Sequence, residues 1–293
     1  MKKYPVIISM IIYMLSATCV LASSSDISVN NQVTEDEQGF SAEELNRFLE
    51  RSGDRKEKDK NWRDYLTVSG NKEDKGDSEI ETVSENSAGK TEEEQDYYIP
   101  DREDEWKLIL VNKQNPIPND YDAELVDIYN GSMIRREIAV PLADMFEAAA
   151  DDGVKLTVCS AYRDHEYQER LFDKKIRTYT KRGMSYLDAF RIGSYSVIIP
   201  GTSEHELGMA LDIVTPGYMS LDDGFADTAA GKWLKKNAYK FGFILRYPEG
   251  KEYITGITFE PWHYRYVGEE AAEFITKKGL TLEEYIEGLK YHR

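Results

Sequence analysis

A ten-residue segment from Ser203 to Asp212 reads SEHELGMALD and places a histidine, a glycine and a single aspartate around a hydrophobic run. The second histidine of the His-Glu-x-x-His motif, in which a helix presents two zinc ligands, is missing after His205. Gly208 also disfavours a continuous helix that would carry His205 and Asp212 on one face. A turn followed by a strand over 209–214 fits the apolar run better. Asp212 is then a buried carboxylate, which must be ion-paired, hydrogen-bonded or bound to a metal.

The four histidines of the chain differ in their surroundings. His292 lies one residue from the C-terminus, and His165 lies among polar residues at the start of an expected helix, so we expect both to be solvated. His205 and His263 instead each lie beside acidic residues and a glycine or proline, within otherwise apolar sequence. One such histidine is more often structural than a ligand. Two of them, together with Asp212, supply the three protein ligands of a catalytic zinc site that keeps a fourth position for water.

Glu260 lies three residues before His263, and Pro261 disfavours helical geometry at Glu260. A carboxylate beside a zinc-bound water can accept a proton and then deliver it to a departing amine. The alternative for Glu260 is a surface salt bridge at the end of a strand. The spacing is therefore compatible with a general base next to a metal ligand.

The N-terminal residues 1–22 have the composition of a secretory signal. Two lysines precede an apolar stretch from Val6 to Ala22, which ends in a small-residue cleavage pattern. The stretch is near the short limit of about 17 residues for spanning a bilayer, so an uncleaved anchor is the alternative. In either case we expect the rest of the chain to lie outside the cytoplasm, either secreted or held at the outer face of the membrane.

The region 23–105 is rich in charged and small polar residues and poor in apolar ones, which predicts a mostly disordered, acidic linker. It carries much of the formal net charge of -17, and this charge argues against nucleic acid as a partner. Because the linker is expected to be disordered, we expect a chain that begins near Glu103, without the linker, to fold and to keep full activity.

One segment of the linker differs from the rest. In FSAEELNRFLERSG, residues 40–53, Ser41 and Glu44 form a capping box ahead of the apolar residues Leu45, Phe48 and Leu49. This pattern predicts either a transient helix or a docking element, and the sequence does not decide between them.

The region 106–293 mixes aromatic, apolar and turn residues, and its length is enough for one sizeable core. Strands are expected at 106–112, 154–160, 209–214 and within 254–268. Helices are expected at 133–151, after a cap at Ser160 or Asp164, and at 229–242, 268–279 and 281–291. These elements do not alternate as regular β-α-β units, so the prediction is an α+β fold.

The pattern Ser203-x-His205-x-x-Gly208-x-Ala210-x-Asp212, followed by Glu260-Pro261-Trp262-His263, resembles the VanY-like D-alanyl-D-alanine carboxypeptidases. These enzymes belong to a zinc peptidase group that also includes VanX-type dipeptidases and L,D-carboxypeptidases of the cell wall. The resemblance extends to LILVNKQNPIPNDY, SAYRDHEYQERLF and FGFILRYPEGKEYITGITFEPWHYRYVG, and it covers Trp106 to about Lys290. It implies a small antiparallel sheet flanked by helices, as in the Hedgehog and D,D-peptidase fold, preceded by the acidic tail.

The resemblance also implies roles for single residues. His205, Asp212 and His263 are expected to bind Zn²⁺. Glu260 is expected to act as general base and then as general acid, and Arg163 to contact the substrate near the scissile carbonyl or the carboxylate. The expected substrate contacts are Ser160, Tyr162, Gln168 and Ser203.

The reaction implied is hydrolysis of the terminal D-Ala-D-Ala bond of peptidoglycan stem peptides in the cell envelope. No protein partner is inferable from the sequence. One alternative is an L,D-carboxypeptidase that trims tetrapeptide stems, because its metal residues would look the same. Another is a non-catalytic, zinc-stabilised binding module, as the related Hedgehog signalling domain suggests. A module need not keep a working base, so the presence of Glu260 favours an enzyme.

Overall fold

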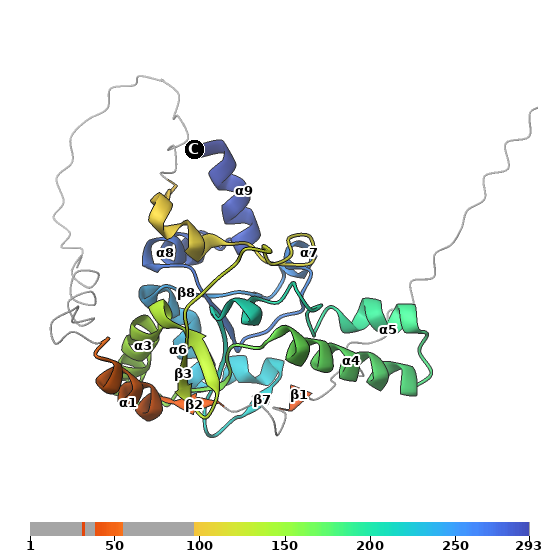
Figure 1. Ribbon diagram of the computed structural model, residues 1–293, viewed down its shortest axis with the longest axis horizontal. Helices are drawn as coiled ribbons and strands as arrows, with labels where there is room; N and C mark the ends of the chain where they lie inside the picture. Colours follow the sequence, from red (N-terminus) through yellow and green to blue (C-terminus); the bar gives the residue numbers. More distant parts are fainter. Residues whose placement is uncertain (1–30, 33–38, 55–96, 293) are drawn as a thin grey trace, which may run out of the picture. The chain divides into compact units, whose positions relative to one another are not determined.

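The computed structural model describes residues 31–32, 39–54 and 97–292 (Figure 1). The expected signal 1–22 and much of the expected linker lie outside these residues. The strands are β1 (Asn31–Gln32), β2 (Phe40–Ser41), β3 (Leu125–Tyr129), β4 (Ser132–Arg135), β5 (Thr157–Ser160), β6 (Ala210–Val214), β7 (Ser220–Leu221), β8 (Phe243–Leu245) and β9 (His263–Tyr266). The α-helices are α1 (Ala42–Ser52), α3 (Ala139–Asp151), α4 (His165–Lys181), α5 (Tyr186–Gly193), α6 (Ala229–Asn237), α7 (Glu252–Thr255), α8 (Glu269–Lys278) and α9 (Leu282–His292). Short 3₁₀ turns are η2 (Arg102–Leu108), η3 (Arg136–Ile138), η4 (Glu204–Leu207), η5 (Asp223–Asp227) and η6 (Ala238–Phe241).

A five-stranded antiparallel sheet lies at the centre of the fold, in the order β2-β5-β6-β9-β8. Every residue of β6 is buried, as the apolar run around Asp212 predicts. A strand buried along its whole length must be covered on both faces, which the surrounding helices and loops achieve. The predicted α+β class and the small antiparallel sheet flanked by helices are thus confirmed.

The main hydrophobic core is the buried cluster formed by side chains of α3, of the central sheet and of α6. Helix α3 contributes Leu142, Met145 and Phe146 to it, the apolar face predicted from its periodicity. The predicted start of this helix at 133 is wrong. Residues 132–135 form β4, which pairs with β3 in a hairpin closed by Asn130 and Gly131, both at positive φ. The Asn-Gly turn favours such a hairpin, and the helix begins only after it.

The strand predicted at 106–112 is also wrong. The chain forms the turn η2 as far as Leu108 and then runs without regular structure. The backbone carbonyls of Lys107 and Ile109 both accept a hydrogen bond from the buried guanidinium of Arg265, each at 3.0 Å. A side chain therefore takes the hydrogen bonds that a neighbouring strand would otherwise supply.

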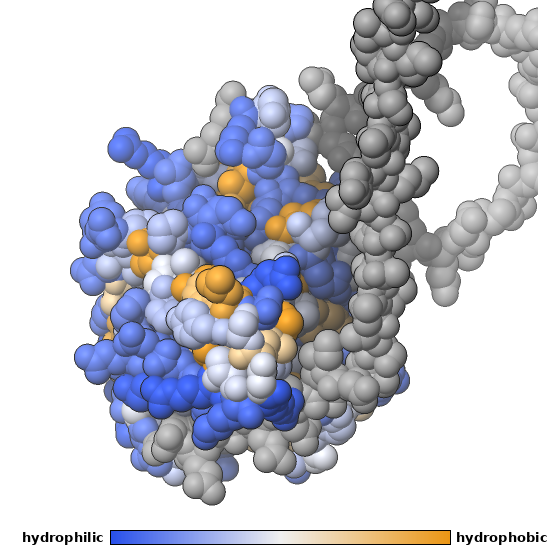
Figure 2. Space-filling model, turned by 90° about the vertical axis from the view of Figure 1, so that its right-hand side faces the viewer, coloured by the Kyte–Doolittle hydropathy of each residue, from blue (hydrophilic) through white to orange (hydrophobic). Residues whose placement is uncertain are grey.

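Helices α4 and α5 run side by side as a hairpin (Figure 1). Of the two caps considered for α4, Asp164 is the one used, because its carboxylate accepts a hydrogen bond from the backbone N–H of Tyr167 at 2.6 Å. The face shown in Figure 2 is mostly hydrophilic, with its apolar residues in separate groups. Within the described residues, no helix is both long enough and apolar enough to cross a membrane.

The segment 40–54, the exception noted within the expected linker over 23–105, belongs to the folded core. Strand β2 pairs with β5, and the side chains of Phe40, Leu45 and Leu49 are buried in the main core. The predicted capping box is present, since the Ser41 backbone N–H and hydroxyl both donate to Glu44 Oε2 at 2.6 and 2.9 Å. Of the two possibilities left open by the sequence, this segment is a docked element. A chain that begins at Glu103 would lack it.

Leu45→Ala is expected to lower the free energy of unfolding by about 2–5 kcal/mol, because a fully buried leucine leaves a cavity. Glu50→Ala, at an exposed position of the same helix, is the matched control and should change stability by less than about 0.5 kcal/mol. Urea unfolding measures both. Equal stabilities for the two variants would show that α1 does not dock in solution.

Candidate metal centre and active site

The sheet places three of the predicted site residues side by side. Asp212, in the middle of β6, is the register partner of Ser160 on β5 and of His263 on β9. Cross-strand partners in an antiparallel sheet direct their side chains to the same face. The pairing of three strands therefore gathers residues that lie up to about a hundred positions apart in the chain.

His205 reaches the same place from a turn rather than from a strand. It lies in η4, which ends at Gly208 with φ of 69°. A Cβ at position 208 would lie 2.7 Å from Leu125 Cδ2 and 3.1 Å from the Arg135 backbone nitrogen. Both the left-handed backbone and the close approach require glycine. This tight turn brings His205 back over β6.

The side chains of His205, Asp212 and His263 converge as a candidate metal centre. One potential ligand atom from each lies within 4.8 Å of the others, and all three residues are buried. His205 Nε2 lies 3.4 Å from Asp212 Oδ2, and His263 Nδ1 lies 3.1 Å from Asp212 Oδ1. Two imidazoles and one carboxylate at this spacing fit the ligand set of a catalytic zinc, which leaves room for a water or a substrate.

Hydrogen bonds orient the first of the two imidazoles. His205 Nδ1 lies 2.7 Å from the carbonyl oxygen of Ala161, so Nδ1 carries the proton and Nε2 faces Asp212 with a lone pair. Burial lowers the pKa of His205 to about 4, which keeps the ring neutral. A neutral imidazole with a free lone pair is the form that binds a metal.

The Asp212 carboxylate is charged despite its burial. Burial acts to raise its pKa, but the hydrogen bond with His263 and the charge of Arg163 act in the opposite direction, and the pKa lies well below the usual value. An anionic carboxylate in a buried cluster needs positive charge close by. Arg163 Nη2 supplies part of it, at 2.7 Å from Asp212 Oδ2.

Glu260 lies at the edge of the cluster, with its Oε2 3.7 Å from His263 Nδ1. A turn holds it there: the Glu260 backbone N–H donates to Tyr247 O, and its carbonyl accepts from the His263 N–H, both at 3.1 Å. Burial raises the pKa of Glu260 to about 8, even though His263 acts to lower it. A carboxyl group that titrates near neutral pH can both accept and donate a proton.

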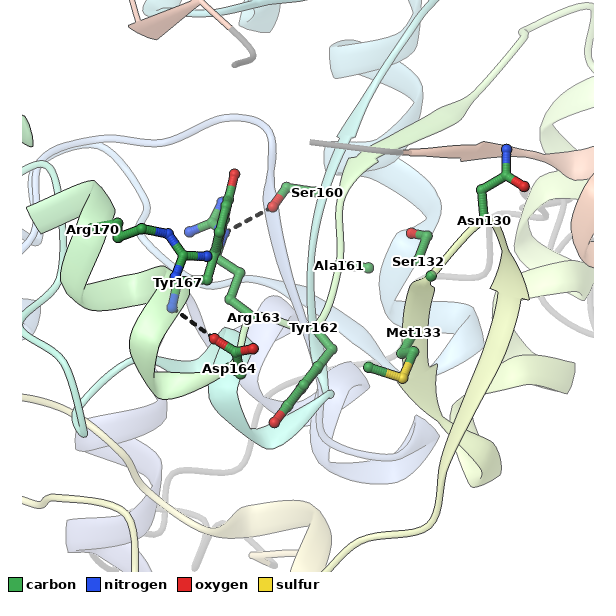
Figure 3. A pocket seen from close by; sticks show the side chains of 11 residues that line it. Asn130, Ser132, Met133, Ser160, Ala161, Tyr162, Arg163, Asp164, Tyr167 and Arg170 are labelled. Carbon is green, nitrogen blue, oxygen red and sulfur yellow. Dashed lines mark hydrogen bonds between the residues drawn. The ribbon is translucent and has the colours of Figure 1, made fainter. Parts of the chain in front are cut away.

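A pocket of about 290 Å³ is lined by Arg163, the residue whose guanidinium contacts Asp212 (Figure 3). The β3–β4 hairpin, with Asn130, Ser132 and Met133, forms one side of it, and the start of α4 forms the other. Between them lies the segment 160–163, from which Ser160, Tyr162 and Arg163 line the pocket. The Arg163 Nε donates to Ser160 Oγ at 2.9 Å, the bond drawn in Figure 3. Arg163 therefore connects the pocket wall to Asp212.

The other two expected substrate contacts do not line this pocket. Gln168 is buried on α4, where its Nε2 donates to the Ile198 carbonyl at 2.7 Å. Ser203 is buried two residues before His205. Gln168 Oε1 and Ser203 Oγ both lack a hydrogen-bond partner among the described residues, so each keeps an atom that a ligand can satisfy.

A buried ionic group that was not predicted from the sequence lies behind the cluster. Glu204, Arg246 and Arg265 are fully buried, and Glu204 Oε1 accepts from Arg246 Nε at 2.8 Å and from Arg265 Nη1 at 2.9 Å. The signal was present, because each arginine interrupts an apolar or aromatic run, FILRY for Arg246 and HYRY for Arg265. The same kind of interruption singled out Asp212.

The family model for VanY, D-alanyl-D-alanine carboxypeptidase, matches residues 131–269. A D-alanyl-D-alanine carboxypeptidase of Enterococcus faecalis is 44% identical over 211 residues, which are 72% of this chain and 75% of that protein. The chain belongs to the VanY family. It is a zinc-dependent hydrolase of the carboxypeptidase class.

Solved structures of similar chains agree with this membership. A D,D-pentapeptidase VanY variant from a VanB-type resistance cassette, in complex with Zn(II), is 48% identical at a TM-score of 0.57 and covers 62% of this chain and 99% of its own. VanYB in complex with D-alanine-D-alanine is 47% identical at a TM-score of 0.58, over 62% and 98%. The LD-carboxypeptidase LdcB is 41% identical at a TM-score of 0.52, over 61% and 84%. Both D,D- and L,D-peptidases of the VanY-like group therefore share this fold.

Proposed function

We propose that this protein is a D,D-carboxypeptidase that removes the terminal D-alanine from peptidoglycan stem peptides ending in D-Ala-D-Ala. The observation that carries the proposal is the buried His205, Asp212 and His263 cluster with Glu260 Oε2 only 3.7 Å from a ligand nitrogen. Support for the substrate comes from the VanY relatives, one of which was solved with D-alanine-D-alanine.

The zinc ligands in this proposal are His205 Nε2, Asp212 and His263 Nδ1. Zinc, when bound there, polarises the peptide carbonyl and makes a water molecule acidic enough to be deprotonated near neutral pH. Glu260 takes that proton and later delivers it to the amine of the leaving D-alanine.

Arg163 is proposed to stabilise the negative charge that develops on the carbonyl oxygen. Its guanidinium lies between Asp212 and the pocket, so the charge is held in place before the substrate arrives. Ser160 fixes the guanidinium through the bond to Nε, and Tyr162 forms part of the pocket wall. Ser203 and Gln168 are proposed to contact the substrate through their unsatisfied oxygens.

Arg163→Ala is expected to lower turnover about 10²–10³-fold, as the loss of one preorganised donor to an oxyanion does, while zinc stays bound. Arg163→Lys should recover only part of this loss, because an ammonium lacks the planar fork of the guanidinium. Steady-state kinetics with zinc analysis of the same samples makes the measurement. Wild-type turnover in Arg163→Ala would remove this residue from the mechanism.

We further propose that the enzyme acts outside the cytoplasm, where stem peptides are exposed, with 1–22 as the secretory signal and an uncleaved anchor as the alternative. The chain would then reach the cell wall as a secreted or membrane-held enzyme.

The carboxylate of Glu260, close to the proposed zinc ligand His263, supports an enzyme over a zinc-stabilised binding module, because a module needs no general base.

Pentapeptide and tetrapeptide stems separate the proposed activity from the L,D-alternative. A D,D-enzyme should release one D-alanine from the pentapeptide and act little on a stem that ends in a single D-alanine. Mass spectrometry of the products under matched conditions gives both rates. Faster trimming of the tetrapeptide would assign the protein to the L,D-carboxypeptidases.

A further inference from the structure

The second ring nitrogen of His263 faces a carboxylate that the mechanism above does not use. Glu204 Oε2 lies 3.8 Å from His263 Nε2. Both atoms are buried, and neither has a hydrogen-bond partner among the described residues. The opposite ring nitrogen, Nδ1, faces Asp212 and Glu260. The imidazole therefore lies between the candidate metal centre on one side and Glu204 on the other.

The form that a metal requires of His263 accounts for this pairing. A neutral imidazole that binds a metal through Nδ1 carries its remaining proton on Nε2. That N–H is buried, and buried donors are nearly always paired with an acceptor. A shift of less than about 1 Å brings Nε2 within hydrogen-bond distance of Glu204 Oε2.

The rest of the Glu204 carboxylate is held in place. Its other oxygen, Oε1, accepts from both Arg246 and Arg265, and Arg246 also donates to both oxygens of Glu283 on α9, at 2.8 and 2.6 Å. Two glutamates and two arginines balance one another in charge. This network uses only one oxygen of Glu204, so Oε2 stays directed at His263 and remains unused by the ion pairs.

We propose that Glu204 is a positioning residue for the zinc site, which accepts the Nε2–H of His263 and thereby fixes the tautomer and orientation of that ligand. The Ala161 carbonyl does the same for His205. A carboxylate partner also raises the basicity of the imidazole and so strengthens the metal bond. The inference rests on the proposed function only in taking His263 as a zinc ligand.

Glu204→Gln is the variant that tests this role. Arg246 and Arg265 still need an acceptor, so they should bind the amide oxygen of the new glutamine side chain. The amide NH₂ group would then face His263 Nε2. Two donors then face each other, and the zinc Kd should rise about 10–100-fold. Competition with a chromophoric chelator measures the Kd without any activity assay.

Glu283→Gln is the matched control, because it removes a negative charge from the same network without approaching His263. It should leave the zinc Kd unchanged, while melts of the zinc-free proteins report how far each change affects folding. A wild-type Kd in Glu204→Gln overturns the proposal, as does an equal loss in both variants. Failure of the wild-type protein to bind zinc would instead contradict the proposed function.

A second measurement uses the unaltered protein and holds even if Glu204→Gln does not fold. In the zinc-loaded wild type, ¹H–¹⁵N spectra of the histidine rings should show a slowly exchanging proton on Nε2 of His263. A second protected proton should appear on Nδ1 of His205, whose acceptor is the Ala161 carbonyl. A His263 ring that is protonated on Nδ1, or whose Nε2 proton exchanges like that of an exposed histidine, overturns the proposal.

Discussion

Replacing Glu260 with alanine is expected to lower turnover about 10²–10⁴-fold while zinc content stays near one ion per chain. The expectation follows because Glu260 is not one of the three converging ligand residues, yet its carboxylate lies against them. The proton taken from water then has no acceptor, and the leaving amine has no donor. D-alanine release from a pentapeptide stem and metal analysis of the same samples measure the two quantities.

Two further variants sharpen this test. Glu260→Gln keeps the shape of the side chain but cannot transfer a proton, so it should be as inactive as the alanine variant. Glu270→Ala, at an exposed position on α8, should keep wild-type turnover. If either Glu260 variant retained near wild-type turnover with zinc bound, the assigned mechanism would be wrong even though the ligands were right.

His263→Ala is expected to abolish zinc binding at chelator concentrations that leave the wild type loaded, and activity should disappear with the metal. Two protein ligands remain of the three that a catalytic zinc ordinarily uses. Loss of a buried ligand also removes the free energy that metal binding contributes to folding, so the melting temperature should no longer rise when zinc is added.

His165→Ala is the control for this change. Its imidazole is exposed, lies 3.1 Å from Glu206 Oε2 and is not one of the three converging residues. Zinc content should therefore equal that of the wild type. Retention of zinc by His263→Ala would show that the ion binds elsewhere.

The candidate site was largely predictable because its residues carry a local signal. A single aspartate inside a buried apolar strand and a histidine just before a glycine turn both conflict with their surroundings unless something compensates. The structure places Asp212, His205 and His263 together, as expected. The roles of these residues, and of Glu260 and Arg163, stay predictions that the experiments above address.

The regions that sequence reasoning misassigned depend on partners far away in the chain. Residues 106–112 have strand composition, but the buried guanidinium of Arg265 takes two of their carbonyls. For the segment 40–54, the capping box and the apolar residues predicted a transient helix or a docking element, but the surface on which it docks lies far away in the chain. Neither the arginine nor the pairing of β2 with β5 can be deduced from periodicity within those segments.

Ser160, Asp212 and His263 lie opposite one another on three adjacent strands, so the candidate metal centre depends on the correct register of these strands. Side chains alternate between the two faces of a sheet, so a slip of β9 by one residue would turn His263 to the opposite face and present a neighbour in its place. Only one register of β6 against β9 places Asp212 and His263 opposite each other. With His205, Asp212 and His263 as the proposed ligands, zinc would bind tightly only to this alignment of β6 and β9, and a misregistered chain would fail to retain the ion.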